Sequence, residues 1–400
     1  AFLRDKKILD MMKIRASYGE IGDDNVSGRW LFQDQWAYNK SWQTYMDPSK
    51  RGGKSPYSWY RESVVGNEDG HWEKVKKLNF GIDYALFEGL FAGSVEVFRD
   101  KRSDILIGGS SRSVPSYYGQ KPATVNKGKV NTRGYELELR FNKKFKNEMR
   151  VWANLSMTHS ENEVIVKDDK PLLPSYRKDA GFSMGQGRYY IDKGFIGSYD
   201  ELYGSPKHEA NNDSRIPGDY YIVDFDGNGI IDQDDQAPYG YSGTPQNTYN
   251  ATVGFEWKGF SCFAQFYGVT NVNRTVSLDC FTNRYNVVFD TGSWWSETGD
   301  AADFVTPRWL SSKVAAYNGT QYVYDASFIR LKNVEVSYTF KNTLTRQLGI
   351  SGLRVFISGN NLWMWSRMPD DREGNFSGAG ANYGAYPIMK RVNLGVKFSL

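Results

Sequence analysis

The clearest candidate for chemistry is an acidic segment near the middle of the sequence, residues 224–235, which reads DFDGNGIIDQDD. Its spacing matches a calcium-binding loop, with side-chain oxygens at positions 1, 3, 5, 9 and 12, a backbone carbonyl at position 7 and glycine at position 6. Such a loop converges several hard oxygen ligands on one cation. The predicted ligands are Asp224, Asp226, Asn228, Ile230 through its carbonyl, Asp232 and Asp235.

Two features qualify this metal prediction. Asp235 stands where the calcium template has Glu, and the shorter side chain weakens bidentate coordination. No helical pattern flanks the segment, so it is not an EF-hand domain. We expect a calcium-loop-like insertion at residues 224–235, with the Ile230 side chain packed inward. Mg²⁺ is the alternative cation, and an Asp/Asn/Gly-rich turn without an ion is the alternative structure.

Three short strings resemble enzyme motifs, and each lacks a required part. Residues 181–185 read GFSMG, but charged loop residues surround them where a nucleophile elbow needs a strand and a helix. Residues 53–55 resemble the end of a P-loop, yet Pro48 occupies the upstream glycine position. His208 begins an H-E-x-x-H string that fails at Asn212. The sequence therefore predicts no enzyme.

Composition narrows the class of protein. The 400 residues carry 50 Lys+Arg against 46 Asp+Glu, a net charge of +4 that is too balanced for a nucleic-acid partner. No apolar run approaches the roughly 18 residues of a membrane-spanning helix. Forty glycines and an aromatic content of 16% fit an all-β protein or a membrane β-barrel.

Strict alternation of apolar and polar residues recurs along the chain and predicts long antiparallel strands. In residues 78–86, Ile82 falls on an apolar face and Asp83 on a polar one. We expect strands of about 9–11 residues, the length that crosses a bilayer when tilted. Short turns at Glu88–Gly89 and at 142–144 alternate with long polar segments, which is typical of an outer-membrane barrel rather than a β-sandwich.

Aromatic residues gather in the predicted loops and are the candidates for contact with a substrate or a covering partner. These are Trp59, Tyr60, Trp294, Trp295 and Trp309. Exposed indole rings suit stacking on sugar rings or packing against peptide side chains. The alternative is an interfacial girdle or packing within the loops.

Several strings spread along the chain resemble the C-terminal part of a SusC/RagA-type TonB-dependent outer-membrane transporter. The resemblance is carried by LDMMKIRASYGEIGDD, WEKVKKLNFGIDYALFEGLFAGSVEVFRDKRSDIL, NKGKVNTRGYELELRF, the Asp-rich loop with the hairpin after it, SFIRLKNVEVSYTF, LRVFISGNNLWMWS and YPIMKRVNLGVKFSL. It covers nearly all 400 residues. It implies an all-β fold: the C-terminal portion of a transmembrane antiparallel β-barrel over residues 1–400, with long extracellular loops.

The same resemblance implies active import of glycans or oligosaccharides across the bacterial outer membrane. It implies a SusD-like surface lipoprotein as a lid, energy from TonB–ExbB–ExbD through an N-terminal plug that we expect to be absent from this chain, and contact with outer-membrane lipid. It also allows a dimer of transporter–lid pairs. On the polar face, Asp83, Glu96, Glu136, Glu138 and Glu335 are expected to face the lumen.

Two alternatives remain open from the sequence. One is a peptide importer of the RagA kind. The other is a secreted or surface carbohydrate-binding β-protein with a structural calcium loop.

Overall fold

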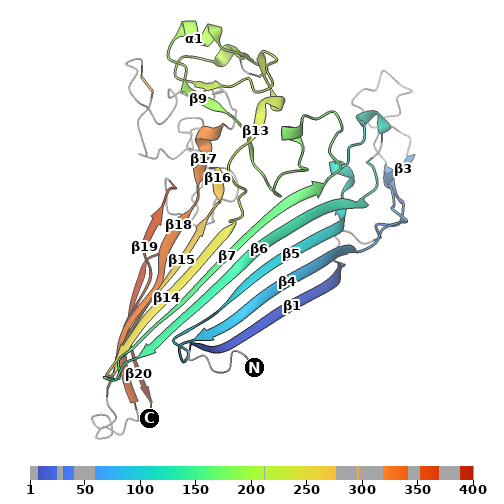
Figure 1. The fold of residues 1–400 in the computed structure, drawn as a ribbon. Coiled ribbons are helices and arrows are strands. Elements are labelled where there is room, and N and C mark those ends of the chain that lie inside the picture. Colours follow the sequence, from blue (N-terminus) through green and yellow to red (C-terminus); the bar gives the residue numbers. More distant parts are fainter. Residues whose placement is uncertain are drawn as a thin grey trace.

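The computed structural model describes residues 8–24, 30–39, 59–119, 121–210, 212–275, 295–296, 319–340, 352–368 and 388–399. Its main feature is one ten-stranded antiparallel sheet, which curves from β1 at one edge to β20 at the other (Figure 1). In spatial order the strands are β1 (Leu9–Asp23), β4 (Glu73–Leu86), β5 (Phe91–Ile107), β6 (Val125–Lys144), β7 (Arg150–Val166), β14 (Asn247–Trp257), β15 (Phe260–Thr270), β18 (Phe328–Thr339), β19 (Gly352–Ser366) and β20 (Arg391–Ser399).

The register gives the sheet one apolar and one polar face, because directly opposed residues in antiparallel strands point the same way. One apolar row runs through Ile14, Ile82, Val95, Leu137 and Met157. Another runs through Phe255, Cys262, Val336, Ile357 and Leu394. The adjacent row on the polar face is Lys13, Asp83, Ser94, Glu138 and Ser156. The predicted separation of Ile82 from Asp83 is confirmed.

Tight turns join the strands at one end of the sheet. Between β4 and β5, Phe87, Glu88 and Gly89 all have positive φ, at 58°, 56° and 75°. This confirms the predicted turn at Glu88–Gly89. The turn predicted at 142–144 is wrong in place, because those residues still belong to β6 and the chain reverses over 145–149.

Several strands are longer than the sequence led us to expect. β6 has 20 residues, and β5 and β7 have 17 each. The alternation that marks a membrane strand stops where both faces meet water, but the hydrogen-bonded ladder continues. The expected 9–11 residues therefore cover only the part of each strand that has an apolar face.

Smaller elements occupy the long connections at the other end of the sheet, above the strand ends in Figure 1. They are β2 (Gln35–Asn39) with β3 (Trp59–Val64), β8 (Arg188–Tyr190) with β13 (Gln236–Pro238), β9 (Asp192–Phe195) with β11 (Tyr220–Ile222), β10 (Lys207–His208) with β12 (Ile230–Ile231), β16 (Asn273–Thr275) with β17 (Val323–Asp325), and helix α1 (Tyr199–Gly204). Among the described residues, no helix has the length and apolarity to cross a membrane.

Apolar cores lie in this loop layer and where it joins the sheet. Tyr190, Ile222 and Ile231 form one buried cluster, within the 167–246 connection. A second cluster joins Val269 at the end of β15 to Val272 and Ala326 in the next connection. The 167–246 connection is therefore a folded layer with its own core, which fixes the position of the acidic segment.

Candidate functional site

The acidic segment folds so that three of its carboxylates converge. Asp224, Asp226 and Asp235 each offer an oxygen, and these oxygens lie within 4.8 Å of one another. Asp235 is fully buried, and its carboxylate accepts hydrogen bonds from the backbone N–H of Phe225 at 2.6 Å and of Asp232 at 2.8 Å. Burial raises the pKa of Asp235. Three convergent carboxylates match the oxygen donors that Ca²⁺ or Mg²⁺ prefers, so these residues fit a hard cation.

Glycines shape the turn around Asp224. Gly227 and Gly229 have φ of 77° and 88°, which L side chains rarely adopt. Both donate backbone N–H groups to the Asp224 carboxylate at 2.7 Å. Burial alone would raise the pKa of Asp224, but these backbone hydrogen bonds outweigh it and hold the pKa below its usual range.

The other predicted ligands have backbone partners in this structure. Asn228 Oδ1 accepts from the Ile230 N–H at 2.7 Å, and Asp232 caps the 3-10 helix Gln233–Asp235. The prediction that the Ile230 side chain packs inward is wrong. That side chain is 46% exposed, whereas Ile231 is fully buried against the core cluster. The two residues alternate along β12, so only one of them can face inward.

On the polar face, charged side chains are paired across neighbouring strands. Arg15 Nη2 lies 2.7 Å from Asp83 Oδ1 and 2.6 Å from Glu96 Oε1. Asn79 donates to the second oxygen of Glu96 at 3.1 Å. Glu335 pairs with Arg354 on the neighbouring strand β19, whereas Glu138 pairs with Arg140 within β6. The register puts the five acidic residues expected to face the lumen on this one face: Asp83, Glu96, Glu136, Glu138 and Glu335.

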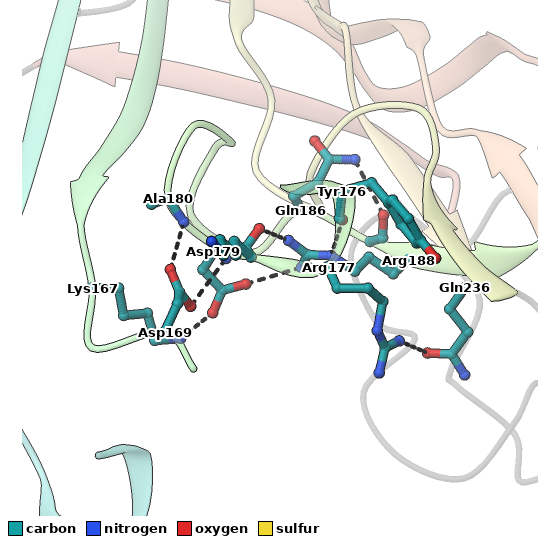
Figure 2. A network of polar contacts seen from close by, with 11 residues as sticks. Lys167, Asp169, Tyr176, Arg177, Asp179, Ala180, Gln186, Arg188 and Gln236 are labelled. Carbon is teal, nitrogen blue, oxygen red and sulfur yellow. Dashed lines mark hydrogen bonds and ion pairs between the residues drawn. The ribbon is translucent and has the colours of Figure 1, made fainter. Parts of the chain in front are cut away.

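A network of ion pairs holds the start of the 167–246 connection. Asp179 pairs with Lys167 and with Arg188, whose Nη1 lies 2.9 Å from the carboxylate (Figure 2). Asp169 accepts from the backbone N–H groups of Asp179 and Ala180 at 3.2 and 3.1 Å. Burial works against ionisation of Asp179, but the two cations outweigh it and lower its pKa.

Asp168 ties this connection to the loop between β5 and β6. It accepts from Arg112 Nε at 3.0 Å, from the Ser113 N–H at 3.2 Å and from Lys127 Nζ at 2.5 Å. The hydrogen bond from Lys127 is the largest cause that lowers the pKa of Asp168, to about 2. Two separate loops are thus fastened at one carboxylate.

A cavity of about 480 Å³ lies under this network, at the long-loop end of β5, β6 and β7. Aliphatic side chains including Ile107, Val130 and Val164 line it, and Val130 and Val164 are paired on the polar face of the sheet. Lys167, Asp179 and other polar residues of the connection form part of its lining. The volume falls within the roughly 300–1,000 Å³ usual for small-ligand pockets. Sequence analysis missed this site, because its lining comes together only through the strand register.

The predicted aromatic contacts are only partly described. Tyr60 is 69% exposed on β3, and its ring lies 5.1 Å from that of Tyr38 on β2. Trp59 belongs to the same strand, and Trp295 is half-buried. Trp294 and Trp309 lie outside the described residues. The structure does not bring Tyr60 together with the acidic segment.

Known proteins are similar to this chain in sequence and in fold, although no family model matches it. TonB-dependent receptor P3 of Formosa agariphila is 24% identical over 99% of this chain and 40% of that protein. TonB-dependent receptor SusC of Bacteroides thetaiotaomicron is 24% identical over 92% of this chain and 35% of its own length. The structure of the RagAB peptide transporter superposes with a TM-score of 0.70 at 18% identity, over 99% of this chain and 41% of that chain.

In sequence and in fold, the chain is similar to part of a SusC/RagA-type TonB-dependent transporter barrel. It spans about two fifths of the curated receptor P3, 40% of its length. Receptors of this type are bacterial outer-membrane proteins, so the apolar face of the sheet is the lipid-facing one and the polar face lines the interior. TonB-dependent transporters are not enzymes, in agreement with the prediction from sequence. The similarity to outer-membrane receptors favours the barrel over the alternative of a secreted or surface carbohydrate-binding β-protein.

Proposed function

We propose that the protein is an energy-coupled importer of the outer membrane, and that this chain contributes barrel wall and the loops above it. The observation that carries the proposal is the sheet itself: an apolar outer face, a polar interior face and, among the described residues, a folded layer over one end. The relatives are named TonB-dependent receptors, which supports TonB as the source of energy. We propose that TonB acts with ExbB and ExbD through a plug.

By analogy with SusC and the RagAB peptide transporter, we propose a SusD-like surface lipoprotein as the partner that covers the barrel. The folded 167–246 layer lies at the end where such a lid would dock. A dimer of transporter–lid pairs is the proposed assembly.

For the cargo, we propose an oligosaccharide first and a peptide second. Exposed aromatic rings such as Tyr38 and Tyr60 offer flat apolar surfaces of the kind on which sugar rings stack. A specific observation favours the second class: the 480 Å³ cavity is lined by Ile107, Val130 and Val164, which suit an aliphatic side chain better than a hydroxyl-rich sugar.

We further propose that the acidic segment holds Ca²⁺ through Asp224, Asp226 and Asp235, with Mg²⁺ as the alternative. The support is the convergence of three carboxylates within 4.8 Å. Held there, the cation would neutralise like charges and stiffen the layer above the barrel. Its role would be structural.

The proposal is tested by growth on single nutrients. A strain carrying the intact transporter should take up its cargo only with the lid lipoprotein and a working TonB system. A panel of labelled oligosaccharides and peptides distinguishes the two cargo classes. Uptake that continues without TonB would contradict active import and favour a passive pore.

A further inference from the structure

A cluster of basic side chains lies on the lipid-facing side of the sheet, directly beyond its apolar band. Along that face the row Phe80, Val97 and Tyr135 is followed by Leu78, Arg99 and Arg133. The next row brings Lys76 opposite Lys101. The face thus changes from apolar to basic within one step of the strand period.

The cluster has six members on three adjacent strands. They are Lys74, Lys76, Arg99, Lys101, Lys129 and Arg133. All six are exposed. Acidic neighbours pair with only part of this charge: Glu20 lies 3.8 Å from Lys76, Asp104 lies 3.8 Å from Lys74, and Glu161 pairs with Arg133. Among the described residues, Arg99, Lys101 and Lys129 have no ion-pair partner, so the cluster keeps an excess of positive charge.

The position of the basic cluster along the strands identifies the membrane leaflet that it contacts. The basic rows lie toward the long loops, because β4 begins at Glu73 after the 24–72 connection and β5 runs on into the 108–124 connection. In outer-membrane barrels the long loops are extracellular. Tyr18, 69% exposed, and Tyr135, stacked on His159 with ring centroids 5.0 Å apart, mark the upper border of the apolar band. The cluster therefore sits at the headgroups of the outer leaflet.

A small polar cavity opens within the cluster. It has a volume of about 240 Å³, and Arg99, Asn131 and Arg133 are among the residues that line it. Planar guanidinium groups recognise phosphate through paired N–H donors. Glu161 and Glu163 also line the cavity, so an incoming anion would compete with Glu161 for Arg133 while Arg99 stays available.

We propose that this surface binds the phosphate groups of outer-leaflet glycolipid, with Arg99 and Arg133 at the centre of the site. Such a lipid would seat its acyl chains on the apolar rows and its phosphates on the basic ones. The apolar acyl chains and the anionic phosphates of the lipid would thus each contact complementary side chains on one continuous face. The proposal concerns lipid and is independent of the cargo and of energy coupling.

The test uses the complete transporter extracted from outer membranes in mild detergent. The variant Arg99→Gln, Lys101→Gln, Arg133→Gln removes three charges. A matched control, Lys143→Gln, Lys144→Gln, Lys146→Gln, removes three at the opposite end of the β6–β7 hairpin. Each nearby basic residue strengthens binding to an anionic surface by about one order of magnitude at most, so we expect roughly tenfold to hundredfold less co-purified phosphorylated lipid A in the first variant only.

A second arm needs no variant. Wild-type protein is titrated into nanodiscs that contain either diphosphorylated or dephosphorylated lipid A. Preference for the phosphorylated lipid supports the proposal, and equal binding overturns it. Displacement by millimolar inorganic phosphate would also overturn it, since the site would then be a simple anion site. Cargo uptake, measured alongside, should change little in the first variant.

Discussion

Arg15 on β1 and Asp83 on β4 are diagonal neighbours joined by two parallel hydrogen bonds, Nε to Oδ2 at 2.9 Å and Nη2 to Oδ1 at 2.7 Å. This is the bidentate geometry of a guanidinium–carboxylate pair. The same Nη2 also reaches Glu96 on β5, so one cation links three strands on the interior face.

The first prediction concerns this link. Arg15→Ala would remove the cation that joins Asp83 to Glu96, so β1 should exchange its amide hydrogens faster. Arg15→Lys keeps the charge but loses the paired N–H donors of the guanidinium. Its β1 amide exchange should be intermediate between those of wild type and Arg15→Ala. Hydrogen exchange of β1 in the detergent-solubilised transporter measures both. Unchanged exchange in Arg15→Ala would show that the backbone ladder alone fixes this strand.

The second prediction tests the two faces. Ile82→Arg places a charge among lipid-facing residues, at a cost of about 2–4 kcal/mol near the bilayer midplane. Ser94→Arg is the control, because Ser94 is opposite Asp83 on the interior face. We expect less folded transporter in the outer membrane for Ile82→Arg alone, measured by heat-modifiable migration. Similar losses in both variants would contradict the assignment of the faces.

The third prediction concerns Asp168. Asp168→Asn removes the charge that fastens Arg112 and Lys127, so proteolysis in the 108–124 loop should accelerate. The folded-state pKa is lowered from 3.8 to about 2, so the stabilisation is complete above about pH 4 and is lost as the pH falls toward 2. Wild-type protein at low pH should approach the variant, and the variant should show little pH dependence over that range. A loop that stays resistant in both would mean that Asp168 does not hold it.

The fourth prediction concerns the acidic segment. With Ca²⁺ bound by its convergent carboxylates, the segment 224–235 should resist proteolysis. Chelation, or Asp224→Ala together with Asp226→Ala, should expose cleavage sites in residues 205–235 while leaving barrel assembly intact. Asp213→Ala, an acidic change outside the cluster, is the control. Equal protease sensitivity with and without chelator would support the ion-free turn.

The two-residue alternation of apolar and polar side chains was enough to predict the sheet, but not the folded 167–246 connection above it. Ile82 and Asp83 were assigned to opposite faces because lipid and water impose a two-residue period. That period ends beyond the membrane, which is why the upper half of β6 was not predicted. In the 167–246 connection, short strands pair across long separations, such as β8 with β13. No local pattern shows whether Ile230 or Ile231 faces inward there.

The candidate site also has a part that the sequence predicts and a part that it does not. Asp224, Asp226 and Asp235 were predicted as ligands because one loop contains all three, and the structure does bring them together. Asp232 also fits the calcium spacing, but its side chain caps the 3-10 helix Gln233–Asp235 by accepting a hydrogen bond from the Asp234 N–H. The aliphatic cavity was not foreseen, since Ile107, Val130 and Val164 belong to three strands.

The length of β6 has a consequence for how cargo would enter the proposed importer. Twenty residues at about 3.4 Å each extend roughly 65 Å, or about 45 Å in height at a tilt near 45°. The apolar band of such barrels is only about 25 Å tall. The hydrogen-bonded wall therefore extends well beyond the apolar band of the membrane. In the proposed importer, cargo would therefore meet a stiff hydrogen-bonded wall, and not only flexible loops, before it reaches the membrane plane.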